Sequence, residues 1–166
     1  MGYTMLVYPY RVFHWSKKGP STLMLRYEGR AEWKIWLRGE QMELLIKLGG
    51  VYNIALVIFH LLFWRLFDWK KDLRKLSFLN RAIMQVLNLS LSFAFIIFSY
   101  ISLVHTNELL STALGHSLLI LMSLFWVARS IEQIVFFKLK HWSSIAFLAF
   151  FLAGAALYAI PALFYT

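Results

Sequence analysis

Four long apolar segments, each about as long as a bilayer is thick, constrain this chain more than any other feature. They lie at residues 48–67, 83–104, 109–128 and 142–165. A helix of roughly 20 predominantly apolar residues crosses a hydrocarbon core. Only helices and closed barrels satisfy their backbone in lipid, and continuous apolar runs without strand alternation favour helices. The sequence therefore predicts an all-α integral membrane protein, an antiparallel four-helix transmembrane bundle with a short non-spanning N-terminal extension.

The composition excludes several classes of chemistry. The chain has no cysteine, so disulfides, thiolate metal sites and thiol redox relays are all excluded. Nucleotide-binding loops and the HExxH and GxSxG motifs are also missing from the sequence. We therefore expect no cofactor and favour a non-enzymatic role, with an intramembrane enzyme ranked behind a transporter or channel. The net charge of +9 does not indicate nucleic acid, because the basic residues lie in the N-terminal stretch and in two connecting loops.

Residues 1–41 differ from the rest, because they are rich in aromatic and basic residues and contain no segment able to span. The alternation at residues 31–37 is compatible with a short strand or hairpin. The alternative is that the stretch is poorly ordered or is not part of the natural product, with the compact protein starting at Met42. We divide the chain into this extension and a four-helix domain at residues 42–166.

Charge in the connecting loops predicts the orientation. The loop at residues 65–81 contains six basic and two acidic residues, among them Lys70, Lys71, Arg74, Lys75 and Arg81. The loop expected at residues 129–141 is also basic, whereas the turn at residues 105–108 has no lysine or arginine. Loops rich in lysine and arginine stay in the cytoplasm. Both basic loops are therefore expected on the cytoplasmic side of a bacterial inner membrane, and both termini on its outer side.

The first basic loop has a further pattern. Trp69, Leu73, Leu76 and Leu79 recur at near-helical spacing, while the basic side chains face elsewhere. This pattern predicts a short amphipathic helix on the inner leaflet. The alternative is an ordinary charged connector that follows the orientation rule.

Polar residues form stripes on the first three apolar segments. The stripes contain Asn53, His60, Gln85, Asn88, Ser92, Ser99, His116 and Ser123, at steps that place each set on one helix face. We call these eight residues the polar seam. Polar groups that faced lipid would go unsatisfied, so the stripes are expected to face other helices.

Two interpretations of the polar seam compete. In the first, its side chains hydrogen-bond across helices and hold the bundle together. In the second, they line a path for protons, ions or a small solute. His60 and Asn88 are predicted at the same depth, so Asn88 is a candidate hydrogen-bond partner for the imidazole. His60 would also be the titrating member of any proton path.

Metal and haem sites have weaker support. His105, Glu108 and His116 are candidates for a metal site near the short turn, although their spacing is not diagnostic. His60 and His116 are expected about 10 Å apart along the bundle, which is a poor arrangement for a bis-histidine haem.

Taken together, these patterns favour a non-enzymatic membrane module or accessory subunit in contact with the lipid bilayer. A homo-oligomer or a membrane-protein partner is compatible with it. The alternative is a small transporter or channel that uses the polar seam. In general pattern the chain resembles small four-span bacterial membrane proteins, and this resemblance implies no site residue.

Overall fold

The computed structural model describes the backbone of residues 22–164 and the side chains of residues 39–163. It divides into two compact units, residues 1–37 and 38–166, and each is described by itself. The expectations for residues 1–21, and for the end of the fourth span at residue 165, lie outside the described residues.

In the first unit, residues 22–37 are helical and belong to α1 (Thr22–Leu61). The strand considered at residues 31–37 was therefore wrong. The alternation there is short, and it includes the good helix formers Ala31, Glu32, Lys34 and Leu37.

The second unit is an antiparallel bundle of four long apolar helices, as predicted. Its candidate spans are the Gly39–Leu61 part of α1, α4 (Phe78–Val104), α6 (Ala113–Phe137) and α7 (Trp142–Phe164). The connections contain α2 (Phe63–Leu66), α3 (Trp69–Asp72), the 3-10 turn η1 (Leu73–Lys75) and α5 (Thr106–Ser111). The protein is thus a membrane protein with four candidate membrane-spanning helices.

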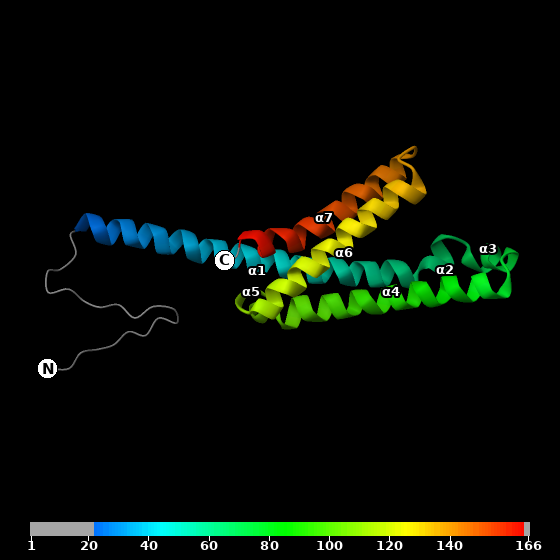
Figure 1. Ribbon diagram of the computed structural model, residues 1–166, viewed down its shortest axis with the longest axis horizontal. Helices are drawn as coiled ribbons and strands as arrows, with labels where there is room; N and C mark the ends of the chain where they lie inside the picture. The colour runs from blue at the N-terminus through cyan, green and yellow to red at the C-terminus, as the bar shows by residue number, and fades with distance from the viewer. Residues whose placement is uncertain (1–21, 165–166) are drawn as a thin grey trace. The chain divides into compact units, whose positions relative to one another are not determined.

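The four long helices form two hairpins. The 39–61 part of α1 lies beside α4, and α6 lies beside α7 (Figure 1). We call the first pair the α1–α4 hairpin and the second the α6–α7 hairpin. The basic end of the bundle holds α2, α3, η1 and the α6–α7 turn, and the turn end holds α5. Toward the basic end the two hairpins diverge (Figure 1).

Side-chain caps set two of the helix starts. Ser77 Oγ accepts a hydrogen bond from the Asn80 amide at 3.4 Å and opens α4. Thr112 Oγ1 accepts one from the Gly115 amide at 2.9 Å and opens α6. Each bond satisfies a first-turn N–H that has no partner within the helix. The third span therefore begins later than the predicted residue 109, and α5 is a separate short helix.

The far end of α6 corrects a second boundary. The predicted loop at residues 129–141 is mostly helix, because α6 continues to Phe137 and leaves only residues 138–141 as a turn. An ion pair at i,i+3 joins Arg129 to Glu132, which lets the helix continue through both charges. Two charged residues consequently lie inside the third candidate span.

The first basic loop is only partly the predicted amphipathic helix. Residues 69–75 form α3 and η1, and the backbone becomes extended at Leu76. Leu73 is buried, whereas Leu76 and Leu79 are exposed. The apolar residues of this loop therefore do not share one continuous face.

Large apolar side chains cover the outside of the bundle. On α4, for example, Ile83, Val86 and Leu87 are all exposed. In water such a surface would aggregate, whereas in a bilayer it is solvated by lipid tails. The apolar outer surface and the lengths of the helices both indicate that the bundle contacts a lipid bilayer.

Candidate functional site: a polar node and an open crevice

The polar seam is mostly buried. Asn53, His60, Asn88, Ser92, Ser99 and Ser123 are buried, whereas Gln85 and His116 are only partly so. Ser92 Oγ donates a hydrogen bond within its own helix, to the Asn88 carbonyl at 2.8 Å, whereas Ser123 Oγ donates to the Ala155 carbonyl of α7 at 3.2 Å. The polar residues of α1 that bond to other helices divide into two groups at different depths.

The first group centres on Tyr158 of α7. Asn53 Nδ2 on α1 donates a hydrogen bond to Tyr158 Oη at 2.7 Å. Ser102 Oγ on α4 lies 3.0 Å from the same oxygen. We call Asn53, Ser102 and Tyr158 the tyrosine node. It joins three of the four spans through one phenolic oxygen, and Tyr158 is fully buried.

Close packing surrounds the tyrosine node. A Cβ placed on Gly49 would lie 2.7 Å from Cζ of Tyr158, and one placed on Gly50 would lie 2.6 Å from Cγ of Leu103. A side chain at either position would meet these atoms and force them to shift. The two glycines therefore let α1 approach both α7 and α4, as small residues do in membrane bundles.

A stack of three aromatic rings lies on the basic side of the node. The rings of Phe95 and Trp126 are stacked at 5.4 Å with 3° between their planes. Phe151 also stacks on Trp126, with 6.0 Å between ring centroids and 23° between their planes. Trp126 is fully buried, and its indole nitrogen has no protein partner among the described side chains. The stack fills the bundle from α4 through α6 to α7.

His60 and Asn88 meet, but not as the sequence analysis expected. Asn88 Nδ2 donates to the His60 backbone carbonyl at 3.1 Å, and not to the imidazole. The imidazole Nδ1 lies 2.9 Å from the Leu56 carbonyl in its own helix. Because a carbonyl only accepts, Nδ1 carries the proton in that bond. The ring stacks on Phe63 at a centroid distance of 4.7 Å.

Beyond the ring stack the two hairpins enclose a cavity of about 730 Å³. We call it the crevice. Its lining comes from both hairpins and from the first basic loop: Leu56, Phe59, His60, Phe63, Phe67, Trp69, Asp72, Leu73, Leu76, Met84, Phe95, Arg129, Gln133, Phe137, His141, Ser143, Ser144, Phe147 and Phe151. Phe95 and Phe151 belong to both the stack and the lining, so the stack is its floor.

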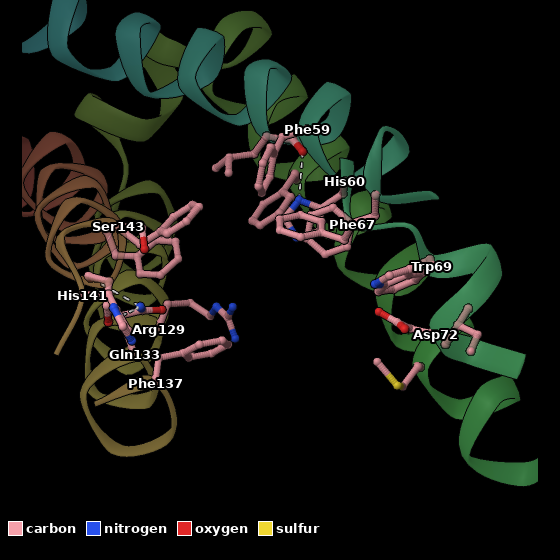
Figure 2. Close-up of a pocket in the computed structure, with 18 of the residues that line it drawn as sticks. Phe59, His60, Phe67, Trp69, Asp72, Arg129, Gln133, Phe137, His141 and Ser143 are labelled. Atoms are coloured by element: carbon pink, nitrogen blue, oxygen red, sulfur yellow. Dashed lines mark hydrogen bonds between the residues drawn. The ribbon is translucent and has the colours of Figure 1, made fainter. Parts of the chain in front are cut away.

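The two walls of the crevice have different character. On the α1–α4 side, Phe59, His60 and Phe67 face the space, with Trp69 and Asp72 nearer the basic end (Figure 2). On the α6–α7 side the lining is more polar (Figure 2). It contains Arg129, Gln133, Phe137, His141 and Ser143. An aromatic wall therefore faces a wall that carries a cation and hydrogen-bonding groups.

Arg129 is the side chain that the sequence analysis missed as a site residue. It projects from α6 into the crevice (Figure 2), with its guanidinium carbon 5.5 Å from the centroid of the Phe151 ring. Its Nη1 pairs with Glu132 one turn along α6. By charge alone, both residues are predicted in the loop at residues 129–141. The run Ile131, Ile134, Val135 and Phe136 could have signalled that the span continues past them.

No protein-family model, no curated protein and no solved structure matches the chain.

The predicted metal candidates do not come together as a set. His105 Nδ1 and Glu108 Oε1 lie 3.7 Å apart near the turn end. Within the described part of the chain no three histidine, aspartate or glutamate side chains form a group that could hold a metal ion.

The predicted basic loop lies at the mouth of the crevice. Lys70, Lys71, Arg74 and Lys75 are exposed, and Arg81 is partly so. Lys75 Nζ donates a hydrogen bond to Asp72 Oδ1 at 2.8 Å, and this bond holds the pKa of that carboxyl below its ordinary value. Asp72 is the acidic residue among the lining side chains, and this bond gives it a partner.

Proposed function

We propose that this protein is a non-enzymatic membrane module that binds a small membrane-resident molecule in the crevice. The observation that carries the proposal is the cavity of about 730 Å³ between the two hairpins. Pockets for small molecules measure about 300–1,000 Å³ and are mostly apolar, with a few placed polar groups. The crevice has this size and this character.

The hydrogen bonds between the hairpins support binding over conduction. Among the described side chains, those that link the two hairpins come from Tyr52, Asn53 and Ser102. Their partners on α7 are the Phe150 carbonyl, at the level of the ring stack, and Tyr158, on the turn-end side of the stack. A channel needs a polar path through the whole bundle. Here direct side-chain bonds and stacked rings occupy the route between the crevice and the turn end.

The lining also supports a binding role over an enzymatic one. Acyl or phosphoryl transfer needs a nucleophile held beside a base. Among the described hydrogen bonds, Ser144 Oγ accepts from Gln133 at 3.0 Å, and His60 bonds to a backbone carbonyl. Neither arrangement activates a nucleophile.

The orientation is part of the proposal. Lysine and arginine gather at the basic end, so this end and the mouth of the crevice face the cytoplasm, with both termini outside. The membrane would be a bacterial cytoplasmic membrane. A role as accessory subunit to a membrane partner, or as a homo-oligomer, is compatible with the same site.

The absence of native cysteine provides a clean test. Ser144 lines the crevice and Ser102 belongs to the tyrosine node, and both are buried. In nanodiscs, Ser144→Cys is expected to react with a water-soluble maleimide from the basic side, whereas Ser102→Cys is expected to stay unreactive. Leu56→Cys, deeper in the crevice, should react more slowly than Ser144→Cys. Equal protection of Leu56→Cys and Ser102→Cys would contradict an open crevice and with it the proposal.

The transporter alternative makes a separate prediction. If the polar seam carries protons or ions, His60→Ala abolishes pH-dependent flux in proteoliposomes while the protein stays folded. Under our proposal no such flux exists in the parent protein, so its detection would favour the alternative.

A further inference from the structure

We propose that the ligand of the crevice is an anionic amphiphile with a single acyl chain, whose carboxylate or phosphate head binds Arg129. This inference rests on the proposed binding function and adds the chemical class of the ligand. The acyl chain lies along the aromatic wall, and the head group lies on the α6–α7 side.

Arg129 is a charged residue within an apolar helix. It lies inside the third candidate span, eight residues before the end of α6 at Phe137. A charge within a span is costly and marks a functional site unless partners satisfy it. The guanidinium has five N–H donors. Among the described residues its one hydrogen-bond acceptor is Glu132, which bonds Nη1 and leaves Nε and Nη2 for another acceptor.

The direction of the Arg129 side chain favours a ligand in the crevice. Arg129 points into the crevice (Figure 2), and Glu132 is not part of the lining. The remaining donors therefore face a space that no described protein acceptor fills. Arginine binds carboxylates and phosphates through two parallel N–H bonds, which fits an anionic head group.

The positive charge around the mouth of the crevice favours an anionic ligand. Lys70, Lys71 and Arg74 are exposed on the first basic loop beside the crevice. Asp72 lines the crevice, but Lys75 bonds to it. A basic mouth attracts anionic head groups from the membrane surface. The same charges disfavour a cationic amphiphile.

The wall of the crevice opposite Arg129, on the α1–α4 side, favours an acyl chain. Phe59, Phe63 and Phe67 pack edge to face along α1 and α2, with centroid distances of 5.1 Å and 4.9 Å between successive rings. The three rings present an apolar surface to the crevice, and two polar side chains on this wall, His60 and Asp72, already bond to the Leu56 carbonyl and to Lys75. Such a wall suits an acyl chain, and the cavity volume suits one small ligand.

The test uses photoreactive probes of equal chain length in nanodiscs of zwitterionic lipid. The probes are a diazirine fatty acid, the corresponding lysophosphatidate, the neutral alcohol and the alkylamine. Mass spectrometry then maps the labelled peptides. We expect the two anionic probes to label the crevice residues roughly tenfold more than the alcohol, because only they form charge-assisted hydrogen bonds to Arg129. The ratio of the two anionic probes distinguishes a carboxylate from a phosphate ligand.

Three variants connect the labelling to Arg129. Arg129→Gln should lower anionic labelling of the crevice roughly tenfold. Lys140→Gln is the matched control, because it removes one exposed positive charge at the same end and should change little. The double variant Arg129→Glu with Glu132→Arg keeps the ion pair and brings a carboxylate into the crevice. It should lose anionic labelling and gain labelling by the alkylamine.

The outcomes separate the two proposals. If the alcohol labels the crevice as strongly as the acids, or if Arg129→Gln changes nothing, the anionic ligand class is wrong while binding in the crevice stands. If no probe labels the crevice above the lipid-facing surface, the proposed binding function fails as well. Should Arg129→Gln not fold, the double variant decides the matter by its preference between acid and amine.

Discussion

The tyrosine node and the crevice lie in the same bundle and draw on similar polar residues, yet they differ in what those residues touch. At the node, Asn53 and Ser102 reach a hydroxyl on a third helix, and the interior is closed. At the crevice, His60 bonds only within the α1–α4 hairpin, to the Leu56 carbonyl and to Asn88, and the α6–α7 hairpin lies across a cavity. The fate of a buried polar residue thus depends on whether a partner helix is within reach.

The comparison also explains why the two ends suit different tasks. Helices in a membrane have no hydrophobic force between them, so packing and hydrogen bonds hold the hairpins together. The node and the close approach of Gly49 supply both. The basic end lacks such bonds between hairpins among its described side chains, and its open space is available to a ligand.

The largest effect is expected at the ring stack that separates the two regions. Trp126→Ala removes a fully buried indole that stacks with both Phe95 and Phe151. Loss of a large buried aromatic costs about 3–5 kcal/mol. Unfolding in detergent, followed by circular dichroism, measures this loss. Trp142→Ala is the control, since Trp142 is 83% exposed and should cost far less. Similar losses for both variants would mean that the stack does not divide the bundle.

Next in size is the node itself. Tyr158→Phe keeps the ring and removes the oxygen that Asn53 and Ser102 share. Leaving a buried polar group unpaired costs about 1–3 kcal/mol, although pairs in membranes average nearer 0.6 kcal/mol. We expect about 1–2 kcal/mol within these limits. A double-mutant cycle with Asn53→Ala measures the coupling. Additive losses would show that the hydroxyl is not the shared partner.

The sequence was a good guide to the spans and a poor one to their partners. Hydropathy predicted the four helices, because apolar length is a property of each segment alone. The stripe pattern marked Asn53 and Asn88 as buried for the same reason. It did not identify Tyr158, whose role depends on three helices meeting at one depth. A tyrosine on an apolar helix needs a partner for its hydroxyl, and that need was the available signal.

For Arg129, too, the sequence predicted the wrong surroundings, because they depend on a partner residue and on the second hairpin. A charge near the end of an apolar run normally marks the end of a span, and the sequence analysis placed it in a loop. The helix continues because Glu132 neutralises Arg129 within one turn. The crevice was beyond prediction, since a cavity arises from how two hairpins diverge and not from any one segment.

A smaller effect is expected for His60. His60→Ala removes one bond to the Leu56 carbonyl and one stacked contact with Phe63. Because this side chain already lines a cavity, its loss should cost about 1 kcal/mol, less than the node. Unfolding in detergent tests the ranking, with Tyr158→Phe measured beside it. A loss larger than that of Tyr158→Phe would mean that His60 at the basic end stabilises the bundle more than the tyrosine node does.

The smallest effect concerns pH at the mouth of the crevice. The hydrogen bond from Lys75 lowers the pKa of Asp72, with a further contribution from the charge of Lys71. A lowered carboxyl pKa stabilises the folded state above the ordinary value of 3.8, and this stabilisation is lost as the pH falls through the folded-state pKa. The tyrosine node has no group that titrates in this range. Acid below about pH 4 should therefore loosen the mouth before the node. Amide hydrogen exchange at Leu76, corrected for the intrinsic dependence of exchange on pH, should rise there, while exchange at Ser102 stays slow. In an Asp72→Asn background the rise at Leu76 should disappear, and its persistence would assign the effect to another acidic group.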